Sequence, residues 1–135
     1  MKLKLSTAKA LANILLAMKI NRIADKEAKA VITKDYLAIR RAVKDTDADC
    51  DELAKKFRED WADEMAKPVK SDAFRKAEAE ANASLVELYE KEAEIALSPV
   101  PSELLFDADL WAEDVTLGQI ANSVDLLVVN GIAKE

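Results

Sequence analysis

The sequence has no histidine and a single cysteine, Cys50, among its 135 residues. Without imidazole, zinc sites built on histidine and nucleophiles activated by histidine are excluded. A lone cysteine excludes an internal disulfide. The absence of disulfides is typical of proteins in a reducing compartment. We therefore expect no cofactor and no metal, and we expect the chain not to be an enzyme.

Glycine and proline are also scarce, with two glycines and three prolines, and no proline precedes Pro68. A glycine-rich phosphate loop is thereby excluded. The first half contains none of the residues that usually interrupt helices, and the composition is rich in strong helix formers such as alanine, glutamate, lysine and leucine. No apolar run is long enough to cross a bilayer, so no membrane partner is expected. These features predict long helices in one domain of residues 1–135.

Charge is distributed unevenly along the chain, whose overall net charge is −6. Residues 1–44 carry eleven basic and three acidic residues, a net charge of +8, whereas residues 45–135 carry a net charge of −14. Such asymmetry serves either a partner or the fold itself. We favour the second interpretation, in which the acidic part packs around a basic helix.

The basic helix is predicted from Lys19 to Val43, because apolar residues lie on one side of it at a turn of ~100° per residue. Its opposite side includes a row of basic residues that forms the candidate interaction surface: Lys19, Arg22, Lys26, Lys29, Arg40 and Lys44. Such a row could follow the phosphates of a nucleic acid. However, only Tyr36 is available to stack on bases, and the whole chain is acidic. We expect the row to bind acidic segments of this chain or of a second copy, with no direct nucleic-acid partner.

The other segments predict a mainly α fold of about four helices in an antiparallel, bundle-like packing. A break is expected near Ile20, a helix from Glu52 to about Ala66, and another from Ser71 or Asp72 to about Tyr89. Thr116 is expected to cap a last short helix. We expect the apolar residues 124–129 to form either a strand or a buried helix end. The tail after Gly131 is expected to be loose.

Two short segments alternate polar and apolar residues, which is typical of strands. They are Lys2–Leu5 and Glu92–Leu97, and their polar positions carry opposite charges. Opposite charges facing each other across a strand pair are favourable. We therefore predict that these segments form a small two-stranded sheet.

Aspartates alternate from Asp45 to Asp51, as in some calcium-binding loops. The required glycine at the sixth position and glutamate at the twelfth are missing in either frame, so we interpret the segment as a helix junction with Asp47 or Asp49 as a cap. Asp35 lies on the apolar side of the basic helix, where it either pairs with a lysine or marks an exposed part of that face, and we favour the pairing. Trp61 and Trp111 are both expected in the core.

Four stretches resemble small, mostly uncharacterised helical proteins encoded by tailed bacteriophages and prophages: KLKLSTAKALANIL, FREDWADEM, IALSPVPSELLF and TLGQIANSV. The resemblance covers most of the chain and implies an accessory or assembly role in the cytoplasm of a bacterial host. It carries no functional residue with it.

The function we expect is that of a non-enzymatic interaction or assembly protein, phage-related and homo-oligomeric or bound to a phage or host protein. The alternative is an acidic regulator or inhibitor of a host nucleic-acid-processing or defence factor. An inhibitor should gather its acidic residues on one exposed face, whereas an assembly protein should cover a face with copies of itself. A hydrolase that uses carboxylates alone is a third reading.

Overall fold

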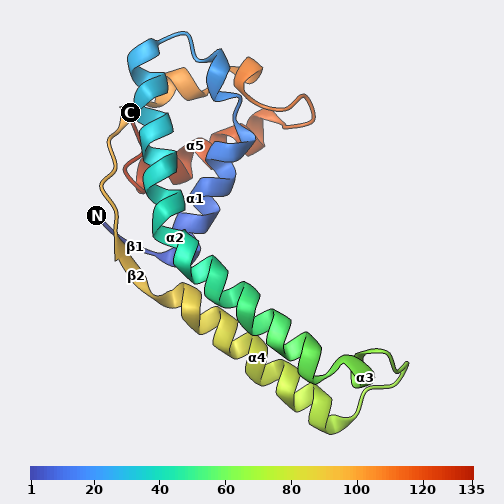
Figure 1. The fold of residues 1–135 in the computed structure, drawn as a ribbon. Helices are drawn as coiled ribbons and strands as arrows, with labels where there is room; N and C mark the ends of the chain where they lie inside the picture. The colour runs from blue at the N-terminus through green and yellow to red at the C-terminus, as the bar shows by residue number, and fades with distance from the viewer.

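The computed structural model describes all residues from Met1 to Glu135 and shows a mainly α protein in two parts (Figure 1). The head contains β1 (Lys2–Lys4), α1 (Leu5–Ala17), the first half of α2 (Lys26–Asp60) and everything after residue 91. The arm, residues 45–90, contains the second half of α2, α3 (Ala62–Met65) and α4 (Asp72–Glu90). The predicted fold class, mainly α with a small two-stranded sheet, is confirmed.

The predicted sheet is present, although it is shorter than expected. β1 pairs antiparallel with β2 (Glu92–Glu94), so that Lys2 lies opposite Glu94 and Lys4 opposite Glu92. The strand ends at Lys4 because Leu5 already begins α1. The N-terminal ammonium pairs with Glu94 at 2.8 Å, which anchors the start of the chain to this sheet.

The core occupies the head. It is formed by α1, the first half of α2, α5 (Leu117–Val129) and the short 3-10 helices η2 (Ser102–Leu105) and η3 (Ala108–Leu110), and a further 3-10 helix, η1 (Ile20–Arg22), packs against it through Ile20. Fully buried residues include Leu11, Leu15, Ile39 and Leu127. Trp111 is buried as predicted, and its indole N–H donates to the Leu105 carbonyl at 2.9 Å.

Helix α2 differs from the prediction at both ends. It starts at Lys26, because the Asp25 side chain accepts a hydrogen bond from the Ala28 N–H at 3.0 Å and caps the helix there. The expected break near Ile20 is confirmed as η1. Lys19 is therefore outside the helix, and its N–H donates to the Leu110 carbonyl at 2.6 Å.

The predicted helix junction at residues 45–51 is wrong, because α2 runs through this segment as one helix of 35 residues. The apolar spacing continues from Val43 to Cys50, both buried, and then to Phe57. The aspartates between Val43 and Phe57 lie on a continuous helix, and most of their side chains are exposed to solvent. The helix therefore needs neither a cap nor a loop at this point. Asp47 is the exception, since it binds Lys9 and Tyr89.

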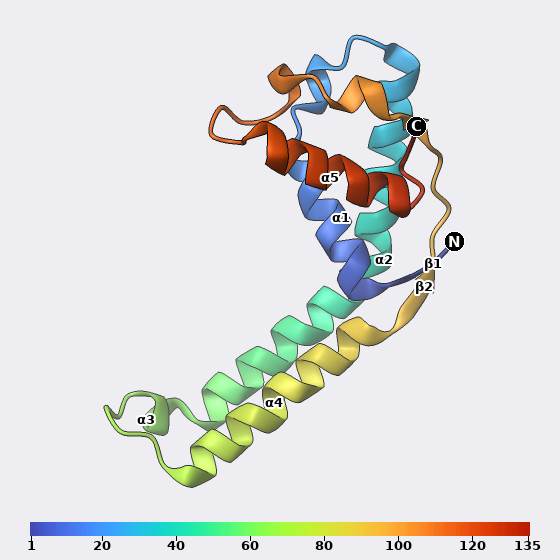
Figure 2. The ribbon, with the colours of Figure 1, turned by 180° about the vertical axis from the view of Figure 1, so that it is seen from behind.

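Helix α4 confirms its predicted cap: the Ser71 hydroxyl accepts from the Phe74 N–H at 3.1 Å. It runs back along α2 to the sheet. The extended segment after β2 then passes along the head and comes close to the C-terminus of the chain (Figures 1 and 2).

The C-terminal segment is held by α5, whose cap at Thr116 was predicted, and by a strand pair that was not predicted. Residues 124–129 form the end of α5, which Thr116 and Gln119 cap reciprocally. Beyond Gly131, whose φ of 80° suits glycine, β4 (Ala133–Lys134) pairs in parallel with β3 (Val100–Pro101). Ile132 and Ala133 are buried, so the expectation of a loose tail is wrong.

Candidate interaction surface

The predicted basic row is divided between two elements. Lys26, Lys29, Arg40 and Lys44 lie on α2, whereas Lys19 and Arg22 precede it and belong to the turn around η1. The Arg22 guanidinium donates to the Asp109 carbonyl at 3.2 Å, so this side chain is tied to η3. The surface that α2 itself presents therefore begins at Lys26.

A groove of about 630 Å³ runs along the basic half of α2, between this helix and the extended segment at Ala96. Four cations line it, namely Lys26, Lys29, Lys34 and Arg41, and no acidic residue does. Its other lining residues are Ala30, Thr33, Leu37, Ala38 and Ala96, and Leu37 is 42 % exposed. The predicted row omits Lys34 and Arg41, although their separation of seven residues places both on one helix face.

A second groove, of about 560 Å³, continues along the same helix and shares Leu37 and Arg41 with the first. It is lined by Arg40 and Lys44 together with Asp47, Ala48 and Asp51. The surface of α2 thus changes from a purely basic first groove to a second groove of mixed charge.

None of the basic residues in this row forms an ion pair. The five ion pairs of the structure involve the N-terminal ammonium, Lys4, Lys9, Lys55 and Lys67. The expectation that acidic segments of the same chain cover the basic helix is therefore not met. Its charge is free to meet another molecule.

The head and the arm are joined by a hydrogen-bonded cluster from three helices. Lys9 of α1 donates to Asp47 of α2 at 3.1 Å and to the Tyr89 hydroxyl of α4 at 3.0 Å, and the Tyr89 hydroxyl donates to Asp47. The hydrogen bonds to Tyr89 and Asp47 raise the pKa of Lys9 to about 12. Burial and the bond to Asp47 raise the pKa of Tyr89 to about 12, while both bonds outweigh burial and lower the pKa of Asp47. Lys9 and Asp47 are therefore charged and Tyr89 neutral at pH 7.

Asp35 is buried, with 1 % of its surface exposed, but no lysine pairs with it. Its Oδ1 accepts the Ser98 backbone N–H at 2.9 Å, and its Oδ2 has no partner. Burial is the main cause that raises the pKa of this carboxyl. Asp35 thus fastens the extended segment to α2, which is a structural task.

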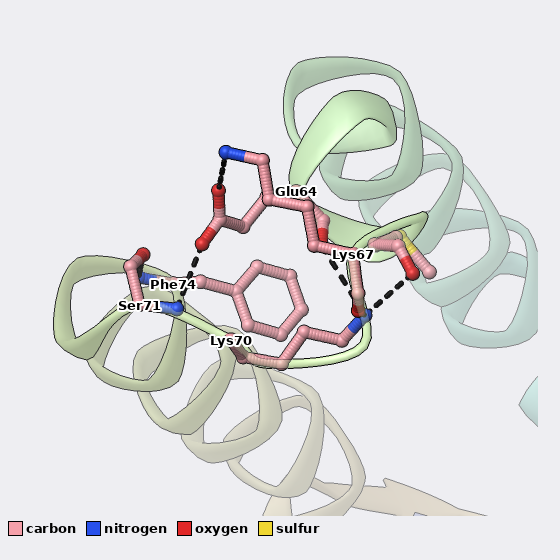
Figure 3. Close-up of polar contacts among 6 residues, drawn as sticks. Glu64, Lys67, Lys70, Ser71 and Phe74 are labelled. Carbon is pink, nitrogen blue, oxygen red and sulfur yellow. Dashed lines mark hydrogen bonds and ion pairs between the residues drawn. The ribbon is translucent and has the colours of Figure 1, made fainter.

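The tip of the arm is held by polar contacts between α3 and the start of α4 (Figure 3). Glu64 accepts the Ser71 N–H at 2.7 Å and pairs with Lys67 at 3.2 Å, and the Ser71 and Lys67 bonds lower the pKa of Glu64 to about 2. The Lys70 ammonium donates to the carbonyls of Glu64, Met65 and Lys67.

Beside this tip, the rings of Phe57, Trp61 and Phe74 pack together, and Trp61 lies 5.7 Å from Phe74 between ring centroids. Trp61 is half-buried in this separate cluster and is outside the core of the head.

No group of three or more acidic or cysteine side chains is placed to hold a metal ion. None of the helices is both long and apolar enough to cross a membrane. Comparison of the chain with protein-family models, curated proteins and solved structures finds no match. Function is therefore inferred from the surface chemistry of α2.

Proposed function

We propose that this chain is a non-enzymatic interaction protein that binds an acidic protein partner along the exposed side of α2. The observation that carries the proposal is the groove of four cations, none of which forms an ion pair with an acidic residue of the chain. The exposed Leu37 and three alanines beside the cations add an apolar strip of the kind that protein interfaces use.

A protein partner is favoured over nucleic acid by what surrounds the groove. The arm carries fourteen acidic and seven basic residues, a net charge of −7, and it continues directly from the basic half of α2. A duplex lying along α2 would meet this arm within the ~10 Å over which charges act at moderate salt. No aromatic side chain lines the groove to stack on bases.

The test is a fluorescence-anisotropy titration with duplex DNA and RNA at low salt. We expect no binding at micromolar protein. Micromolar binding that Lys26→Glu with Arg40→Glu abolishes, and that weakens with salt at a slope of about 0.9 per neutralised phosphate, would show a nucleic-acid protein instead.

The phage-related assembly role in a bacterial cytoplasm belongs to this proposal and rests on the resemblance of the four sequence stretches. Neighbouring genes test it: structural genes would support assembly, and a defence-system context would support inhibition.

The acidic arm supports a second candidate function, that of an inhibitor that competes with nucleic acid. Its acidic side chains are exposed on both α2 and α4, with Asp45, Asp49 and Glu52 on α2 and Glu80 and Glu87 on α4. An inhibitor of this kind should release duplex DNA from a basic DNA-binding protein. An arm in which Glu80 and Glu87 are both changed to glutamine should do so less well.

A further inference from the structure

Six residues of α2 form a stripe whose charges reverse about its centre: Lys34, Ala38, Arg41, Asp45, Ala48 and Glu52. They are separated by four, three, four, three and four residues, so they lie on one face of the helix. This face is opposite the buried side formed by Ile32, Ile39, Val43 and Cys50, because the two sets differ by about half a turn. All six are exposed except Ala38, which is half-buried.

The stripe is complementary to itself. When two copies of α2 lie antiparallel around residue 43, Lys34 meets Glu52, Arg41 meets Asp45 and Ala38 meets Ala48 of the other copy. The two-fold axis repeats each contact, which brings four pairs of opposite charge together. Alanines between them allow the two helix backbones to approach closely. We infer that this stripe is the interface of an antiparallel homodimer, so that the acidic partner proposed above is a second copy of this chain.

The two halves of α2 also carry opposite net charge, and the acidic excess is confined to residues 45–52, which hold five acidic and no basic residues. Residues 26–44 carry six basic and two acidic residues, a net charge of +4, and residues 45–60 carry seven acidic and three basic residues, a net charge of −4. An antiparallel pair centred on residue 43 places the acidic residues 45–52 of each copy opposite residues 34–41 of the other, which carry three basic residues and the buried Asp35.

This segregation does not benefit the isolated helix. Arg40 and Lys44 are four residues apart, as are Asp45 and Asp49, and like charges at this spacing repel. The helix dipole acts only within the first and last turns, so it does not account for charge in the middle of α2. A second copy does account for it, because each like-charged block then faces its opposite.

The expected dimer is weak and sensitive to salt. A helix of 35 residues is ~50 Å long and offers a strip ~10 Å wide, so about 500 Å² is covered on each copy. Stable complexes cover about 800 Å² on each partner. Association should therefore be seen at low salt and high concentration, and screening of the ion pairs should dissociate it.

A charge-exchange experiment tests the stripe. One variant carries Lys34→Glu with Arg41→Glu, and the other carries Asp45→Lys with Glu52→Lys. Each variant alone brings four like-charged pairs together in a homodimer, and we expect its dissociation constant to rise about tenfold or more. Mixing the two variants makes all four pairs opposite again and should restore the dimer, measured by sedimentation velocity at low salt.

The control matched to the Lys34 and Arg41 variant carries Arg75→Glu with Lys76→Glu, which lowers the net charge by the same four units at exposed positions of α4. This control should dimerise like the original chain. Only monomer at high concentration and low salt, or a mixture of the two variants that stays monomeric, would overturn the inference.

The inference rests on the proposed function, but the two fail differently. Absence of the dimer leaves an interaction protein whose acidic partner is another molecule, whereas duplex binding in the anisotropy titration removes the proposed function itself.

Discussion

Asp35 holds the extended segment at Ser98 against α2, but it lowers the stability of the folded protein near neutral pH. Its carboxylate holds the Ser98 N–H, but its second oxygen is buried without a partner. Because its pKa is raised in the folded state, the folded protein binds a proton here more tightly than the unfolded chain does. The stability from this group is present at low pH and falls as pH rises from the usual aspartate pKa to the raised one.

We predict that the Asp35→Asn variant is more stable than the original chain at pH 7. Its free energy of unfolding should also change less with pH between the usual aspartate pKa and the raised pKa of Asp35 in the folded protein. Asparagine keeps an oxygen for Ser98 and removes the buried charge. Asp35→Ala removes the acceptor of the Ser98 N–H, and we expect the loss of this hydrogen bond to lower the free energy of unfolding by about 1 kcal/mol. Urea unfolding at several pH values measures both, with Asp125→Asn on the exposed side of α5 as the control. An asparagine variant that is less stable at pH 7 would contradict the prediction.

At the scale of elements, the cluster of Lys9, Asp47 and Tyr89 ties α1 and α4 to α2 where the head meets the arm. We predict that Tyr89→Phe destabilises the protein by about 1 kcal/mol, because Asp47 loses its hydroxyl donor in a half-buried place. Chemical denaturation measures the loss. Tyr36→Phe is the matched control, since the Tyr36 hydroxyl forms no hydrogen bond with the chain, and an equal loss in both variants would argue against the cluster.

At the scale of the whole molecule, the head and the arm have very different amounts of core. Of the residues in α4 only Phe74 is buried, whereas α1 buries four residues and α5 three. Local opening requires less free energy where fewer apolar contacts are lost. The arm should therefore open without the head.

Hydrogen exchange at high salt, where the chain is expected to be monomeric, checks this difference. We predict that amides of α4 and of residues 52–60 exchange before those of α1 and of residues 28–43. Exchange should slow in the arm at low salt and high protein concentration if α2 is covered by a second copy. Equal protection of α4 and α1 in the monomer would contradict the prediction for the arm.

Much of the local structure was predictable because its causes are local. The alternation in residues 2–4 and 92–94, with lysines facing glutamates, was enough to predict a pairing across almost ninety residues. The caps at Ser71 and Thr116 depend on side chains that lie next to the helices they begin. The mainly α class follows from helix-forming composition and scarce glycine and proline.

The sequence by itself thus determined the mainly α class, the caps at Ser71 and Thr116, the small sheet and the separation of charge, since each depends on neighbouring residues or on a simple period. Only the tertiary structure decided that α2 continues past Lys44, because aspartates are compatible with either a cap or a solvated helix face. It alone decided that a backbone N–H meets Asp35, and that Asp47 belongs to the cluster with Lys9 and Tyr89. It also decided that the basic side of α2 stays uncovered. These outcomes depend on how segments distant in the chain pack in space, and no local pattern records that.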